Sequence, residues 1–291
     1  GFAQMGEPLG LGDAEKAIRE ILNDDRMKQF DEKGEVDFSL SYRGIGRFRG
    51  NAFRQRGEAS LVLRRIDTRV PTIDSLGLPS VLEKLVMQRN GLILVVGATG
   101  SGKSTSLAAM IDYRNANAGG HILTLEDPIE YMHDHKKSIV AQREVGTDTD
   151  SFMSGMKSAL REAPDVILMG EVRDLETMEF AMKFSNTGHL TLSTLHANNS
   201  ITTMERILGF FPKDGIEAQA KRISQNLRAI ICQRLVPGVN GGKVAAIEVL
   251  INTGYIGDLI SKMELASIKD AVERGGFPRG DSGRGGREGA T

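Results

Sequence analysis

One run of the chain combines glycines, a lysine and several hydroxyl side chains in an order suited to a phosphate chain: Gly97, Ala98, Thr99, Gly100, Ser101, Gly102, Lys103, Ser104 and Thr105. It separates an apolar strand expected at 92–96 from a helix expected at 103–116. Glycines let backbone N–H groups turn toward phosphates, and the helix N-terminus adds partial positive charge. Lys103 suits the β- and γ-phosphates, and Ser104 suits Mg²⁺. The sequence therefore predicts a P-loop that binds ATP.

Carboxylates follow two further apolar runs, at the strand ends where a parallel sheet gathers ligand-binding residues. Glu171 ends one of these runs and is a candidate for managing Mg²⁺ and water. Glu126, Asp127 and Glu130 follow the other run, 121–125. A carboxylate at this place could polarise the attacking water. The spacing does not choose among these three residues.

Histidines and arginines supply other possible contacts to a nucleotide. His189 and His196 flank the apolar run 190–195, so they lie on opposite faces of a strand and are not expected to share a metal. From the residues alone, a structural role is favoured for each strand-end histidine, although both are expected at sheet ends beside the nucleotide. An arginine that reaches the γ-phosphate from another domain or subunit raises the rate roughly 10³–10⁵-fold. From the residues alone, a solvated face is favoured for the N-terminal arginines, which are Arg43, Arg47, Arg49, Arg54, Arg56, Arg64 and Arg65.

The elements that must position these residues form two patterns. Apolar residues of 13–30 have helical spacing, and 36–66 alternate with period two, which predicts a small antiparallel sheet with a helix against it. From Ser80, apolar strands alternate with helices, which indicates an α/β domain with a mostly parallel sheet covered on both faces. We expect an N-terminal domain at 1–66, a linker at 67–79, an ATPase domain at 80–275 and a disordered tail at 276–291.

Composition excludes several classes of protein. The 291 residues are 40% hydrophobic and 26% charged with a formal net charge of −1, so no nucleic-acid partner is expected. The single cysteine, Cys232, excludes a disulfide framework and a cysteine-based zinc site. No apolar run is long enough to span a bilayer. We expect a cytoplasmic protein whose membrane association depends on a partner.

Four boxes, taken together, resemble the secretion ATPase superfamily and, within it, the PilT/PilU retraction ATPases of type IV pili. They occur in the family's order within about residues 30–270, as GATGSGKS, ILTLEDPIEY, APDVILMGEVRDLETM and TGHLTLSTLHANN. The extended acidic and histidine boxes, with the ILGFFP that follows, are more similar to PilU than to PilT. Relative to the family pattern, the chain begins partway into the N-terminal domain, and it lacks an Ala-Ile-Arg-type motif near its C-terminus.

The resemblance implies a PAS-like N-terminal domain and a RecA-like ATPase domain with nucleotide between them. It implies that Glu130 is the general base and that Glu171, with Ser104, acts on Mg²⁺. His189 and His196 are implied to sense or contact the nucleotide.

The resemblance also implies that N-terminal arginines reach the nucleotide across the cleft between the domains. Arg49 and Arg64 fall near the family's positions, and Arg54 and Arg65 are rival candidates.

The resemblance further implies a homo-oligomer, a hexameric ring whose ATP hydrolysis turns an inner-membrane platform protein to withdraw pilins. The chain would then lie at the cytoplasmic face of the inner membrane, and a paralogous retraction ATPase is a possible partner. One alternative is an accessory subunit that binds ATP but depends on such a paralogue. Motors for pilus assembly or type II secretion usually carry a four-cysteine zinc site, which this chain cannot supply.

Overall fold

The computed structural model describes residues 10, 12–42, 45–66, 69–239 and 241–273. The chain packs as two compact units. The first consists of Gly1–Arg69 with the short segment Glu130–Met132, and the second consists of Val70–Ile129 with His133–Thr291. The tail expected at 276–291 lies outside the described residues.

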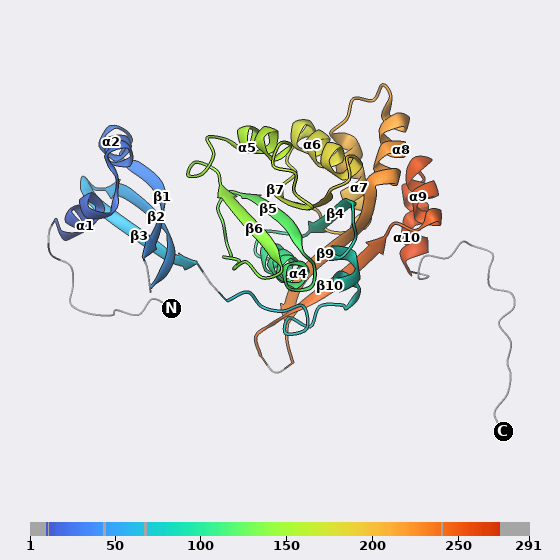
Figure 1. Ribbon diagram of the computed structural model, residues 1–291, viewed down its shortest axis with the longest axis horizontal. Coiled ribbons are helices and arrows are strands. Elements are labelled where there is room, and N and C mark those ends of the chain that lie inside the picture. Colours follow the sequence, from blue (N-terminus) through green and yellow to red (C-terminus); the bar gives the residue numbers. More distant parts are fainter. Residues whose placement is uncertain (1–9, 11, 43–44, 67–68, 240, 274–291) are drawn as a thin grey trace, which may run out of the picture. The chain divides into compact units, whose positions relative to one another are not determined.

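The first unit is a small antiparallel sheet with two helices on one face (Figure 1). Its elements are α1 Asp13–Ile21, α2 Asp24–Lys33, β1 Glu35–Tyr42, β2 Gly46–Gln55 and β3 Glu58–Ile66. The helical spacing of 13–30 belongs to two helices, because the Asn23 side chain accepts the Arg26 N–H and begins α2. Phe30 of α2 is buried with Val36, Phe38 and Ala52 of the sheet, so apolar burial holds helices and strands together.

The second unit is an α/β domain around one sheet. Its elements are α3 Val81–Val86, β4 Gly91–Val96, α4 Lys103–Asn117, β5 Gly120–Glu126, β6 Ser138–Glu144, α5 Phe152–Ala159, β7 Val166–Glu171, α6 Leu175–Asn186, β8 Leu190–Leu195, α7 Ser200–Gly209, α8 Ile216–Asn226, β9 Leu227–Pro237, β10 Lys243–Ile251, α9 Gly254–Ser261 and α10 Leu265–Glu273. Within the described residues the sheet order is β10-β9-β4-β8-β7-β5-β6, and every pair except β10–β9 is parallel. The predicted mostly parallel sheet and the small α+β unit before it are confirmed.

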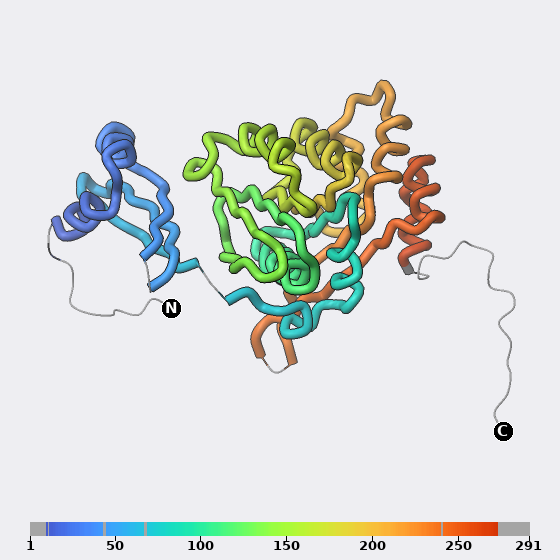
Figure 2. The backbone as a smooth tube through the Cα atoms, viewed as in Figure 1, coloured from blue at the N-terminus to red at the C-terminus, as the bar shows by residue number. Residues whose placement is uncertain are grey.

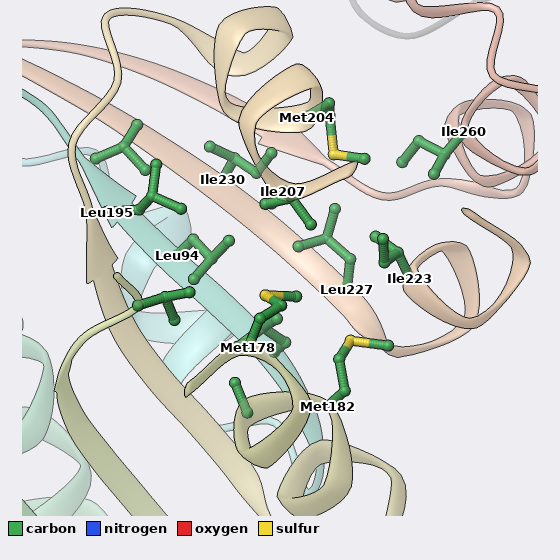
Figure 3. Packing of buried hydrophobic residues seen from close by; sticks show 14 of the residues in the cluster. Leu94, Met178, Met182, Leu195, Met204, Ile207, Ile223, Leu227, Ile230 and Ile260 are labelled. Atoms are coloured by element: carbon green, nitrogen blue, oxygen red, sulfur yellow. The ribbon is translucent and has the colours of Figure 1, made fainter. Parts of the chain in front are cut away.

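Both faces of this sheet are buried, as strand β4 shows. Leu94 and Val96 pack with α6, α7 and α8, whereas Ile93 and Val95 pack with α3 and α4. Figure 3 shows the first of these two layers, in which Leu94 lies among methionines and branched aliphatic side chains from the helices. Because the strand is covered on both sides, its sequence is apolar throughout instead of alternating.

Two features of the second unit differ from the sequence-based expectations. Much of the expected linker packs on this unit, since Ile73 and Leu78 are buried beside α3 and α4. Strand β6 was not expected, and it pairs in parallel with β5 at the edge of the sheet. Figure 2 follows the chain out of β5, through the connecting segment and back into β6. No helix of the described residues is long and apolar enough to cross a membrane.

Candidate nucleotide-binding site

The P-loop connects β4 to α4 at the carboxyl end of the strand. Gly102 has φ +87° and begins α4, and no side chain within the described part of the chain caps that helix end. Lys103 Nζ donates to the carbonyl oxygens of Gly97 and Ala98, at 2.9 and 3.0 Å. Ser101 Oγ is buried and has no hydrogen-bond partner among the described residues. The loop therefore offers backbone N–H groups, a lysine and a buried hydroxyl, which are the donors that a phosphate chain needs.

Gln233 of β9 holds this loop from the neighbouring strand. Its Nε2 donates to Ser101 O at 2.8 Å, and its Oε1 accepts from Ser106 Oγ of α4 at 2.7 Å. A Cβ on Gly97 would come within 2.4 Å of the Gln233 carbonyl oxygen, so the chain needs glycine there. The Gln233 side chain, which the sequence analysis did not single out, is 3% exposed. Its sequence signal is an amide directly after the apolar run 229–232 of the strand.

Glu171 and His196 meet at the same edge of the sheet. Glu171 ends β7, His196 follows β8, and their Oε1 and Nε2 atoms lie 3.2 Å apart. Arg173 Nε donates to the other carboxylate oxygen of Glu171 at 2.9 Å. A helix with a side-chain N-cap follows each residue, α6 after Glu171 and α7 after His196. At the start of α6, hydrogen bonds from the Thr177 backbone N–H and hydroxyl lower the pKa of Asp174. The strands order Glu171 and His196 as a pair, with β8 between β7 and the P-loop strand β4.

His189 does not join this pair, and the expectation that both histidines lie beside the nucleotide is wrong for it. His189 precedes β8, so it lies at the amino end of a parallel strand whose carboxyl end faces the P-loop edge. Its Nδ1 lies 3.0 Å from Thr187 Oγ1 and 3.1 Å from Phe184 O. Its ring meets Phe184 edge-on at 5.8 Å. These contacts make His189 a packing residue of the α6–β8 turn within this chain.

The three carboxylates of the acidic segment after β5, Glu126, Asp127 and Glu130, lie in different environments. Glu126 Oε1 accepts from Thr124 Oγ1 at 2.7 Å and lies 3.4 Å from Gln142 Nε2 of β6. Asp127 and Glu130 are exposed, and Glu130 belongs to the segment that groups with the first unit. Glu126 is thus engaged in holding β6, which leaves Asp127 and Glu130 as carboxylates open to solvent.

Register in the first unit distinguishes the candidate arginines. Arg49 of β2 and Arg64 of β3 are direct cross-strand neighbours on the face away from α1 and α2. Arg54 lies on the other face, 4.9 Å above the Phe30 ring and 3.9 Å from Glu15. Arg65 follows Arg64 in the strand and so also faces the other way. Like charges directly opposite destabilise a sheet, so the Arg49–Arg64 pair is suited to an anion.

Comparison with known proteins places the chain. The family described as Type II/IV secretion system protein matches residues 24–249. The chain belongs to this family. The type IV pilus ATPase PilU of Pseudomonas aeruginosa is 51% identical over 92% of this chain and 70% of its own length. PilT of the same organism, a type IV pilus retraction ATPase, is 44% identical over 92% of this chain and 78% of its own length.

A solved structure, the pilus retraction motor PilT with bound ADP, has a TM-score of 0.87 and 46% identity, covering 89% of this chain and 76% of that one. The predicted resemblance to the PilT/PilU group, closer to PilU, is confirmed. A metal would have to be held as Mg²⁺ usually is, by few protein oxygens together with phosphates. The described residues contain no group of three or more His, Cys, Asp and Glu side chains able to bind a metal.

Proposed function

We propose that this chain is an ATP-hydrolysing motor that powers the retraction of type IV pili. The observation that carries the proposal is the P-loop on β4 with the Glu171–His196 pair at the same edge of the sheet. An ATPase needs hydrogen-bond donors for the phosphates and a carboxylate at adjoining strand ends. The similarity to the relatives named PilU and PilT supports the type IV pilus as the machine on which this motor acts.

In this proposal the loop 97–105 binds the phosphates of ATP, and Lys103 leaves its loop carbonyls to contact the β- and γ-phosphates. Ser104 and Glu171 would hold Mg²⁺, which would supply positive charge to the phosphates. His196 is paired with Glu171 at 3.2 Å and can report whether the carboxylate is engaged by the metal.

The attacking water is activated by Glu130, an exposed carboxylate of the acidic segment. General-base catalysis of this kind contributes about 10²–10⁴-fold to the rate. Arg49 and Arg64, opposed on one face of the N-terminal sheet, supply positive charge to the phosphates from the first unit of the same or an adjacent chain.

As a motor, the chain works as a homo-oligomer, a hexamer in our proposal, at the cytoplasmic face of the inner membrane. Its partner there is the platform protein of the pilus machine, which hydrolysis turns. A paralogous retraction ATPase is a further candidate partner, and the proposal includes no nucleic acid.

Steady-state ATP turnover of the chain and its Glu171→Ala variant tests the proposal. We expect the variant to lose about 10²-fold or more of kcat, because the carboxylate at the metal is gone. Glu176→Ala serves as the control, because it removes an exposed carboxylate of α6 and leaves Glu171 with its hydrogen-bond partners. Unchanged turnover in Glu171→Ala would remove the catalytic assignment, and strong stimulation of the parent chain by DNA would favour a translocase.

A second candidate is an accessory ATPase subunit that depends on a paralogous motor. The higher identity to PilU than to PilT, 51% against 44%, favours it. Turnover measured alone and with a purified PilT-type motor separates the two. A motor turns over ATP alone, whereas an accessory subunit gains most of its turnover from the paralogue.

A further inference from the structure

The segment that carries Glu130 is attached to strand β6 on both sides. Upstream of Glu130, the Ile129 N–H donates to Glu144 Oε2 at 3.1 Å. Downstream, the His133 N–H donates to Gln142 Oε1 at 2.8 Å. Both acceptors belong to β6, at the edge of the sheet beside β5 (Figure 1). Side chains two positions apart on a strand share a face, so one face of β6 holds the backbone before and after Glu130.

Glu144 is a buried acidic residue, and the burial of a carboxylate costs free energy of hydration. Its side chain is 4% exposed, and a buried carboxylate requires hydrogen-bond donors to offset its lost hydration. Thr147 Oγ1 donates to its other oxygen at 3.3 Å, and the Asp148 N–H donates to its backbone carbonyl at 2.8 Å. Ile129 is itself buried, at 1% exposure. The Ile129 amide is thus fixed by a buried carboxyl oxygen of Glu144 at 3.1 Å.

Gln142 adds a second function to its hydrogen bond with His133. Its Nε2 lies 3.4 Å from Glu126 Oε1, and the Val145 N–H donates to Glu126 O at 2.9 Å. The carboxyl ends of β5 and β6, the strands before and after the connecting segment, are therefore hydrogen-bonded to each other. The backbone on both sides of Glu130 is therefore hydrogen-bonded to β6.

We propose that Glu144 and Gln142 are positioning residues for Glu130: they hold the backbone on both sides of it so that its carboxylate meets the attacking water. This inference rests on the proposed role of Glu130. A displacement of about 1 Å at a reacting group can cost about 10²-fold in rate. Loss of either acceptor should therefore lower kcat and leave ATP binding, which depends on the P-loop, nearly unchanged.

The test compares Glu144→Ala, Glu144→Gln and Gln142→Leu in the full chain, by steady-state ATP turnover and by titration with a fluorescent ATP analogue. We expect Glu144→Ala and Gln142→Leu to lose about tenfold or more of kcat, with Kd changed less than twofold. Glu144→Gln keeps an acceptor oxygen for the Ile129 N–H and should recover most of the rate. Ser138→Ala is the matched control, because Ser138 lies at the opposite end of β6 from Glu144 and its Oγ donates to a different backbone group, Ala118 O, at 2.7 Å.

Double variants separate this inference from the proposed function. If Glu144 acts through Glu130, Glu130→Gln with Glu144→Ala should be no slower than Glu130→Gln alone. A fast Glu130→Gln variant would overturn the role of Glu130 itself. A slow Glu130→Gln variant with wild-type kcat in both Glu144→Ala and Gln142→Leu would overturn only the positioning role. Should Glu144→Ala fail to fold, Gln142→Leu decides, since Gln142 is only half-buried.

Discussion

Buried amide side chains of this protein form hydrogen bonds that fix neighbouring loops and helices. Gln233 grips the P-loop through Ser101 O and α4 through Ser106 Oγ. Asn115, which is fully buried, donates to Asp134 O at 2.7 Å and accepts the Lys136 N–H at 3.1 Å. Each of these amides both donates and accepts, so one side chain satisfies two groups that would otherwise be buried without a partner.

Gln233→Leu should weaken nucleotide binding. The substitution keeps the volume but leaves Ser101 O and Ser106 Oγ without their partner, and each lost hydrogen bond costs about 0.5–1.5 kcal/mol. We expect Kd for a fluorescent ATP analogue to rise about tenfold. Thr191→Val, on strand β8 at the far side of β4, is the control because the Thr191 hydroxyl is buried and has no partner within the described structure. Equal Kd values for Gln233→Leu and the parent chain would show that the loop keeps its shape without this amide.

His133 should make stability depend on pH. Burial lowers the pKa of His133 from 6.5 to about 4, so the folded chain binds fewer protons than the unfolded chain between these values. The stabilisation is therefore complete above pH 6.5 and is lost as the pH falls toward 4, by up to about 3 kcal/mol. Urea unfolding at several pH values should show this loss, and His133→Gln should reduce it. An equal pH dependence in both chains would contradict the prediction.

At the scale of elements, the sequence predicted most of the second unit because strands buried on both faces read as continuous apolar runs. The strand β6 was missed for a physical reason: at the sheet edge it buries Ser138, Val140 and Glu144 but exposes Ile139, so its pattern is neither apolar nor alternating. The candidate site divides in the same way. The P-loop and Glu171 follow apolar strands, whereas Gln233 and Glu144 act through tertiary contacts that have no local sequence pattern.

The antiparallel pairing of β2 and β3 places Arg49 opposite Arg64, where the proposed function of the two charges has a cost in the stability of the sheet. Arg64→Thr removes one of two like charges that face each other across the strands, so amide hydrogen exchange in β2 and β3 should slow about two- to fivefold. ATP turnover should fall at the same time, because a charge proposed to reach the phosphates is lost. Arg65→Thr, on the opposite face, should change neither in this way. Faster turnover in Arg64→Thr would show that the pair has no catalytic part.

The candidate residues of the whole molecule are divided between its two units. The P-loop, Glu171 and His196 lie in the second unit, whereas Arg49, Arg64 and the segment with Glu130 group with the first. Hydrolysis in the proposed function thus requires groups from both units at one nucleotide. In the proposed function, a change at the phosphates would alter which groups of the two units act on the nucleotide, and the chemical step would thereby be coupled to motion.

The same division predicts that nucleotide controls assembly. If the first unit of one chain supplies arginines to the nucleotide of the next, a nonhydrolysable ATP analogue should stabilise a ring, because it binds the closed arrangement better than the separate chains. Sedimentation velocity with the analogue and Mg²⁺ should show a species with the mass of six chains. The Lys103→Ala variant, which lacks the phosphate contact, should remain smaller under the same conditions. A parent chain that stays monomeric with the analogue bound would contradict the motor and would leave an ATPase that acts only through a partner.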